Sequence, residues 1–324
     1  MDDSTSVDVG NGSATRRRPS SGSTSSSSSS SFSFQPPRNG SFAASTYPLP
    51  PDAASYPGQE RSLAGIAGRA FCLGIALATG VLLAASLALL PLWVRLAPRV
   101  DDNAARSAVV DVVAPLWRLP CFLATLAAFH FLEFWATATY NTPAASVDAF
   151  LLTSNWPAYA IAHTAAGAEC LLRYTLFRGD GAAVLPVPLS WWPRQTPPPP
   201  LLLLQMVVGW TLVLGGQAVR TAAMVQAGRS FNHTVQRRRA TGHALVTRGV
   251  YGRLRHPSYF GFFWWALGTQ LVLGNAVCLV VYAVVLWRFF AARIRHEEAL
   301  LVRFFGADYV AYRARVGTKI PFIS

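Results

Sequence analysis

Long apolar stretches constrain the fold of this chain more than any other feature of its sequence. Several of them reach the roughly 20 residues that an α-helix needs to cross a bilayer. The first is apolar almost without interruption from Leu73 to Leu92. Only 13% of the 324 residues are charged, whereas soluble domains carry about 25%. The sequence therefore predicts an all-α integral membrane protein.

We expect about six membrane-spanning helices, the last two of which form a hairpin. The break between those two falls at Gly274-Asn275, a pair typical of a tight turn. An amphipathic helix over residues 293–315 is expected to follow the hairpin. The expected spans cover approximately residues 69–94, 119–140, 156–177, 201–223, 258–273 and 276–292.

Composition divides the chain into three parts. Residues 1–60 are rich in serine and poor in aliphatic side chains, so they are expected to form a disordered cytosolic tail. Residues 61–200 hold the first three spans and their loops, including a proline-rich loop whose Trp191 and Trp192 are typical of a membrane interface. Residues 201–324 hold the last three spans, the polar loop between the fourth and fifth of them, and the tail helix.

The net charge of +13 comes almost entirely from arginine. These arginines flank the apolar spans instead of forming a soluble patch, which argues against nucleic-acid binding and for contact with anionic lipids. The densest groups lie between the fourth and fifth spans and near the C-terminus. By the positive-inside rule this side is cytosolic, and six spans place both termini there.

The four cysteines all fall inside apolar runs without paired spacing. Neither a disulfide framework nor a zinc site is expected from them. No HExxH, CxxC or phosphate-binding glycine-rich motif occurs either, so no metal site is expected.

Ionisable and polar groups inside the expected spans are candidates for function, because burying them in lipid is costly. Two interpretations remain open: they pair with one another across the bundle, or they form the polar wall of a substrate cavity. These residues are His130 and Glu133 in the second span, His163 and Glu169 in the third, and Gln217 and Arg220 in the fourth.

Two polar clusters bracket the expected hairpin. In Arg255-His256-Pro257, proline occupies a first helical position, and the exposed N–H groups of that helix end can hold a carboxylate. The second cluster holds the acidic pair Glu297-Glu298, and Arg293 lies four residues before Glu297, on the same helical face. The hairpin brings both clusters to one side of the membrane, which suits a zwitterionic cofactor. The alternative for Arg255-His256-Pro257 is a positively charged flank of a membrane span. The alternative for Arg293 and Glu297 is a surface ion pair worth less than about 1 kcal/mol.

Short motifs follow one another in order along the last third of the chain. They are Ala227-Gly228, Ser230-Phe231-Asn232-His233, His243-Ala244-Leu245-Val246-Thr247, Gly249-Val250-Tyr251, Arg255 to Gly261, Gly268-Thr269-Gln270, Leu286 to Phe290, Glu297-Glu298, Phe304-Phe305-Gly306 with Tyr309, and Ile320 to Ile323. Through these segments, residues 217–323 resemble the isoprenylcysteine carboxyl methyltransferase family, and the six-span count is similar to that of its fungal members. Phe129-His130 with Glu133 resembles the family more loosely.

The resemblance implies a function and a set of site residues. The implied reaction is methyl transfer from S-adenosyl-L-methionine to the α-carboxylate of a C-terminal S-prenylated cysteine. It takes place at the endoplasmic reticulum membrane, in a site that faces the cytosol. The implied partners are prenylated CaaX-type proteins, such as small GTPases and pheromone-like peptides. Arg293 would bind the substrate carboxylate. The implied cofactor-binding residues are Gln236, His243, Ala244, Leu245, Val246, Tyr251, His256, Pro257, Ser258, Tyr259 and Glu297.

This chemistry agrees with the residues present. An α-carboxylate has a pKa near 3.5, so it is already an anionic nucleophile at neutral pH and needs no general base. An arginine can hold it bidentately, while the apolar tail enters from the bilayer. The alternatives are a phospholipid-amine methyltransferase, a membrane sterol reductase that uses NADPH, and a non-catalytic membrane scaffold. An amine acceptor would be poorly served by a neighbouring Arg293.

Overall fold

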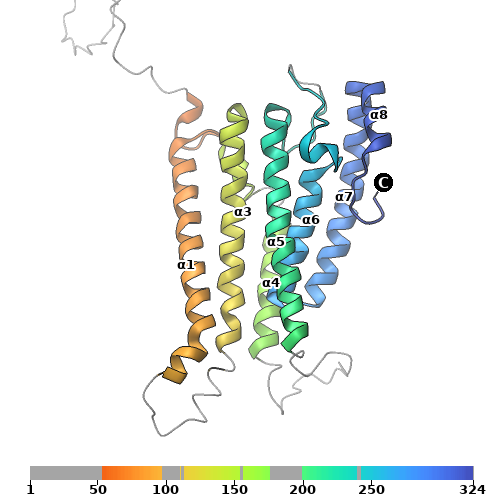
Figure 1. The fold of residues 1–324 in the computed structure, drawn as a ribbon. Helices are drawn as coiled ribbons and strands as arrows, with labels where there is room; N and C mark the ends of the chain where they lie inside the picture. The colour runs from red at the N-terminus through yellow and green to blue at the C-terminus, as the bar shows by residue number, and fades with distance from the viewer. Residues whose placement is uncertain are drawn as a thin grey trace, which may run out of the picture. The chain divides into compact units, whose positions relative to one another are not determined.

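All of the regular structure in the described part of the chain is helical (Figure 1), as the apolar stretches predicted. The structure is a computed structural model and describes residues 53–96, 110, 113–153, 156–175, 199–238 and 242–323. The principal helices are α1 (Leu63–Leu96), α3 (Arg118–Tyr140), α4 (Ala158–Thr175), α5 (Pro199–Ala227), α6 (Pro257–Leu273), α7 (Val277–Phe305) and α8 (Ala307–Arg315). Short 3₁₀ turns are η1 (Ala53–Ser55), η2 (Ala114–Trp117), η3 (Thr142–Ala144), η4 (Val147–Phe150), η5 (Gly228–Ser230) and η6 (Gly249–Gly252).

Each expected span coincides with a helix. Among the described residues, four segments are long and apolar enough to cross a membrane, namely Leu63–Leu96, Ala114–Tyr140, Leu202–Ser230 and Val277–Phe305. The helices α4 and α6 do not meet both requirements, because α6 has only 17 residues and α4 only 18 of lower hydropathy. The chain is thus a multi-pass helical membrane protein, and its six-span topology stays a prediction.

The expected boundaries differ from the structure at both ends. The prediction of a separate tail helix over residues 293–315 was wrong. Helix α7 continues to Phe305, because no helix-breaking residue interrupts it. The turn comes at Gly306, which has φ of 56°, and α8 follows. At the other end, described structure begins within the expected tail, where the Glu60 carbonyl accepts a hydrogen bond from Val147 N. Residues 1–52 of that tail lie outside the described residues. The proline-rich loop with Trp191 and Trp192 also lies outside them.

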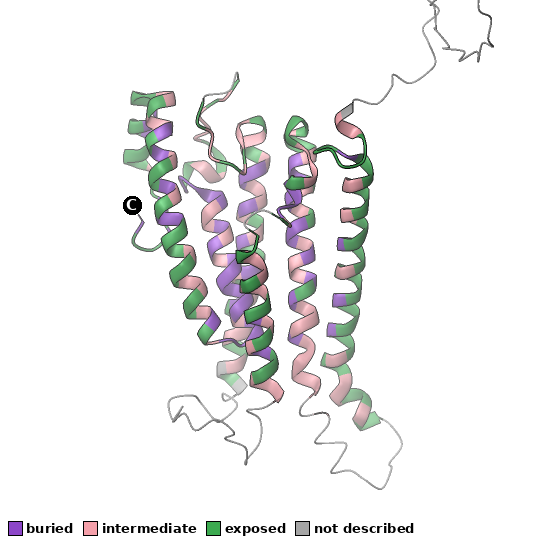
Figure 2. Cartoon of the chain, turned by 180° about the vertical axis from the view of Figure 1, so that it is seen from behind, coloured by how far each residue is buried: buried purple, intermediate pink, exposed green. Residues whose placement is uncertain are grey.

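Helices α5 and α6 pack at backbone distance. A Cβ atom added to Gly216 would lie 2.6 Å from the carbonyl oxygen of Gly261, and one added to Gly268 would lie 2.7 Å from that of Gly209. Glycine at these positions therefore allows the two helices to touch. Buried residues gather on α6, whereas much of α1 and α7 is exposed (Figure 2).

The turn between α6 and α7 confirms the expected hairpin. Gly274 ends α6 in the left-handed conformation, with φ of 78°, as glycine commonly does at a helix C-terminus. Glu169 of α4 then accepts hydrogen bonds from the N–H groups of residues 276, 277 and 278 at 2.7–2.9 Å. Its carboxylate thus caps the positive end of α7, a structural role for one of the candidate polar residues.

Candidate functional site

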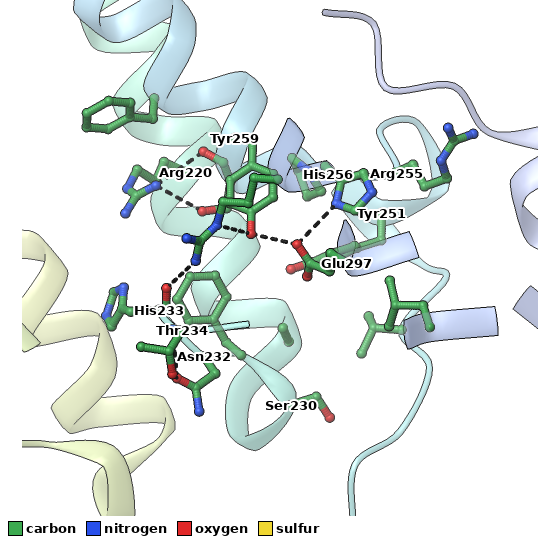
Figure 3. A pocket seen from close by; sticks show the side chains of 18 of the residues that line it. Arg220, Ser230, Asn232, His233, Thr234, Tyr251, Arg255, His256, Tyr259 and Glu297 are labelled. Carbon is green, nitrogen blue, oxygen red and sulfur yellow. Dashed lines mark hydrogen bonds and ion pairs between the residues drawn. The ribbon is translucent and has the colours of Figure 1, made fainter. Parts of the chain in front are cut away.

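A cavity of about 290 Å³ lies between the end of α5, the start of α6, the second half of α7 and α8. Figure 3 shows residues that line it. This volume is close to the lower end of the range for small-molecule sites, roughly 300–1,000 Å³. Its wall combines ionisable groups with aromatic rings. A smaller cavity of about 50 Å³ shares Ser230, His243 and Glu297 with it.

The residues to which the family resemblance assigns a role gather at these two cavities. Arg293 and all of the cofactor-binding candidates except Gln236 line the larger one, and Gln236 lines the smaller one. They come from the loop after η5, from η6, and from the facing ends of α6 and α7. The structure therefore brings together residues up to about 60 positions apart in the sequence, while their individual roles stay predictions.

The start of α6 forms one side of the cavity. His256 is its N-cap and Pro257 its first residue, as the sequence predicted. The imidazole Nδ1 of His256 lies 3.9 Å from Glu297 Oε2, so the expected meeting of the two polar clusters is confirmed. The helix end and a carboxylate thus face the same space, one with partial positive and one with negative charge.

Tyr259 stands between the two residues expected to act on cofactor and substrate. Its hydroxyl donates to Glu297 Oε2 at 2.6 Å and accepts from Arg293 Nε at 2.9 Å. Arg293 Nη2 also donates to the carbonyl of His233 at 2.6 Å. Both hydrogen-bond partners of Arg293 are neutral oxygens, so its positive charge remains available for an anionic ligand.

A buried ion pair between α3 and α5 lies at the wall of the cavity. Arg220 of α5 donates to both carboxylate oxygens of Glu133 of α3, at 2.5 and 2.7 Å, and to Ser258 Oγ at 3.0 Å. Glu133 is fully buried and Arg220 lines the cavity. Pairing across the bundle is thus confirmed for Glu133 and Arg220, which with Ser258 join three helices, and Arg220 also forms part of the cavity wall.

His130, the other candidate residue of the second span, contributes to tertiary packing. His130 Nδ1 lies 2.8 Å from the carbonyl oxygen of Phe150, which ties η4 to α3. His130 does not line either cavity. Its conspicuous place in an apolar span therefore reflects a tertiary contact.

Glu298 organises a second polar cluster, in which the expected meeting of the acidic pair Glu297-Glu298 with the basic segment before α6 is confirmed. Its carboxylate accepts from Arg255 Nε at 2.6 Å and lies 3.1 Å from His256 Nε2 and 3.7 Å from Arg313 Nη1. Arg255 also donates to the carbonyls of Arg313 and Val316. The cluster attaches α8 and the chain after it to the start of α6. The sequence indicated that these residues meet, whereas the contacts of the cluster with α8 were not predicted.

His233 is a further wall residue to which no role was assigned. Burial lowers the pKa of His233 to about 4, which nearby Arg220 and Arg293 reinforce, so its ring is neutral at pH 7. The ring Nε2 lies 3.3 Å from Thr137 Oγ1. The motif from Ser230 to His233 was the available signal, and all four of its residues line the larger cavity.

Comparison with known proteins agrees with this site. Residues 207–303 match the model of the isoprenylcysteine carboxyl methyltransferase (ICMT) family. The protein-S-isoprenylcysteine O-methyltransferase of Saccharomyces cerevisiae is 44% identical over 202 residues, which cover 62% of this chain and 79% of the yeast protein. The chain belongs to this family. The resemblance read from its motifs is thereby confirmed.

Other family members match over the same length. The protein-S-isoprenylcysteine O-methyltransferase of Schizosaccharomyces pombe is 44% identical, with 62% of this chain and 83% of that protein covered. The Homo sapiens protein of that name is 38% identical, with 62% of this chain and 64% of the human protein covered. A solved structure of a eukaryotic intramembrane Ras methyltransferase of this family has a TM-score of 0.59 and 31% identity, with coverage of 80% of this chain and 77% of that one.

Proposed function

We propose that this chain is a protein-S-isoprenylcysteine O-methyltransferase, which transfers a methyl group to the α-carboxylate of a C-terminal S-prenylated cysteine and so forms a methyl ester. The observation that carries the proposal is the arrangement of Arg293, Tyr259 and Glu297 in one cavity of a membrane helix bundle. It offers an anion site and a cation site joined by one hydroxyl.

The methyl donor is S-adenosyl-L-methionine, and the cavity residues fit its chemistry. The positive end of α6 suits its carboxylate, and Glu297, whose side chain is 28% exposed, suits its ammonium group. Tyr259 and Phe290, stacked with ring centroids 5.1 Å apart, add aromatic surface. When bound, this cofactor supplies an electrophilic methyl group. The proposed holding residues are those to which the family resemblance assigns that role.

Arg293 positions the acceptor carboxylate. That group is anionic at neutral pH, so alignment and exclusion of water take the place of proton removal. Leu151, Phe262 and Phe289 line the same cavity and provide apolar surface next to the guanidinium. A prenyl chain contributes roughly 0.8 kcal/mol for each CH₂ group that it buries, which favours a site reached from the bilayer.

The substrates are prenylated CaaX-type proteins, including small GTPases and pheromone-like peptides. The enzyme acts in the endoplasmic reticulum membrane, with its site toward the cytosol. Support for this orientation comes from the exposed arginines near the cavity, among them Arg237, Arg238, Arg295 and Arg303, because positive charge gathers on the cytosolic side. Assignment to the endoplasmic reticulum rests on the family resemblance.

The two alternative activities receive less support. A phospholipid-amine methyltransferase would place a cationic acceptor beside Arg293, whose charge opposes it. A sterol reductase would need a nicotinamide cofactor, whereas the relatives reported above are methyltransferases by name.

The decisive experiment supplies purified protein with methyl-labelled S-adenosyl-L-methionine and a farnesylcysteine acceptor. We expect a base-labile labelled methyl ester. Binding of S-adenosylhomocysteine, measured by thermal shift with NADPH as the comparison, tests the cofactor separately. A folded protein that forms no labelled ester, or that is stabilised by NADPH alone, would contradict the proposal.

A further inference from the structure

The segment after α8 leaves one large side chain outside the fold. Phe322 is 95% exposed, whereas Thr318, Ile320 and Ile323 around it are 1%, 2% and 9% exposed. Its backbone has φ of 60°, a left-handed conformation that is costly for a bulky residue. The segment is thus anchored on both sides of Phe322 and turns its ring outward.

The residue before Phe322 is hydrogen-bonded to an exposed, largely apolar face of α7. The carbonyl of Pro321 accepts a hydrogen bond from Trp287 Nε1 of α7 at 2.8 Å. On α7, which is apolar enough to span a membrane, exposed residues nearby include Val280 and Val284. Trp287 is itself exposed, and an exposed Arg288 follows it, as is typical of the level where acyl chains meet headgroups.

We propose that residues 319–322 form a membrane-inserted turn, in which the Phe322 ring lies among phospholipid acyl chains beside α7. Two observations carry this inference: the exposure of an aromatic ring in a strained backbone, and its attachment to an interfacial tryptophan. Contact with lipid removes the ring from water and so offsets the strain. Exposed Lys319, three residues earlier, suits a headgroup phosphate.

The turn is mechanically connected to the candidate site. Arg255 donates from its backbone N–H to the carbonyl of Gly317 at 2.9 Å and from Nη1 to that of Val316 at 2.8 Å. The same arginine holds Glu298. A bilayer contact at Phe322 therefore fixes a segment whose other end braces the cavity wall.

Photo-cross-linking tests the proposal in the full-length chain. The photoreactive residue p-benzoylphenylalanine replaces Phe322 in protein reconstituted into phosphatidylcholine–phosphatidylserine vesicles, and adducts are identified by mass spectrometry. Val284, which is 52% exposed on α7, is the matched lipid-facing control, and Ile320, which is 2% exposed, is the buried control. We expect phospholipid adducts at 322 and 284 and none at 320.

Two outcomes would overturn the proposal. One is a lipid adduct at position 284 but none at 322, which would place the ring in water. The other is an adduct at 322 to a second copy of this chain in place of lipid, which would make the turn a protein interface. Circular dichroism and the thermal midpoint of each variant show whether it is folded.

Discussion

Tyr259 donates a 2.6 Å hydrogen bond to Glu297 across the gap between α6 and α7. The same hydroxyl accepts a hydrogen bond from Arg293. Tyr259 thus fixes the separation between Glu297, which is proposed to bind the cofactor, and Arg293, which is proposed to bind the substrate. The pair from α7 alone, four residues apart, would otherwise be free to form a direct ion pair.

Replacing Tyr259 with phenylalanine tests this arrangement. The variant keeps the ring and loses the hydroxyl, so Arg293 and Glu297 lose their common partner. A hydrogen bond to a charged group contributes about 1.5–3 kcal/mol, and we expect kcat/KM to fall roughly tenfold to a hundredfold. The measurement is steady-state methylation of a farnesylcysteine acceptor, with the thermal midpoint as the folding control. Wild-type kinetics in a folded variant would refute the role.

Substitutions of Arg293 and Glu297 should separate the two binding functions. Glu297→Ala is expected to lose affinity for S-adenosylhomocysteine, because the ammonium group loses its counter-charge. Arg293→Ala is expected to retain that affinity and lose turnover of the carboxylate substrate. Calorimetric binding and single-turnover methylation measure the two effects. Equal loss of cofactor binding in both variants would show that Arg293 belongs to the cofactor site instead.

The buried pair of Glu133 and Arg220 should be costly to break. Glu133→Ala leaves a guanidinium buried without its counter-ion, and such changes destabilise by about 3–5 kcal/mol. The double variant Glu133→Leu, Arg220→Met replaces the pair with apolar groups and should be more stable than the single variant. Thermal unfolding in one detergent compares all three proteins. A single variant as stable as the wild type would show that water reaches the pair.

Two adjacent glycines of α5 provide a matched test of the helix contact. Gly216→Ala places a methyl group within 2.6 Å of the Gly261 carbonyl, whereas a Cβ on Gly215 meets no atom within 4 Å. The first change should destabilise by about 1–3 kcal/mol through overpacking. The second should be neutral or stabilise by up to about 1 kcal/mol through helix propensity. Equal thermal midpoints would mean that α5 and α6 can separate without cost.

The neutral His233 predicts a pH dependence of stability. Its pKa is about 4 in the folded protein against 6.5 for the free side chain, so between these values the unfolded state binds more protons. Stability should rise with pH through this window. The contribution is complete above pH 6.5 and lost by pH 4, up to about 3 kcal/mol. Unfolding at several pH values in the wild type and in His233→Gln measures it, and the variant should lack this part of the slope.

The helices were predictable because their signal is local. Apolar runs and the Gly274-Asn275 turn fixed the expected spans to within about six residues of α1, α3, α4, α5 and α6, and fixed the start of α7. The largest error in a helix boundary, near Ala292, arose because the change from apolar to amphipathic sequence was taken for a helix end. A helix that leaves the membrane can continue into water, and only Gly306 stops it.

The candidate site was predictable as a set of residues and not as a network. Ordered motifs indicated which side chains belong together, and the cavity gathers them. The partners themselves depend on tertiary contacts: Arg220 and Glu133 are 87 residues apart, and Arg255 and Glu298 are 43 apart. No spacing rule within one helix relates such pairs, so the sequence placed Glu298 near the basic segment without showing that Arg255 and His256 are its partners.

The glycine contact between α5 and α6 has a consequence for the width of the site. A Cβ on Gly261 would meet Arg220 as well as Gly216, at 2.8 Å from its backbone nitrogen, and Arg220 and Ser258 lie within about one turn of that crossing. The absence of side chains at Gly216 and Gly261 therefore sets the distance between α5 and α6 where Arg220 and Ser258 meet at the cavity wall. In a relative with larger residues at these two positions, we expect the helices to lie farther apart and the ligands to bind more weakly, even with every polar group retained.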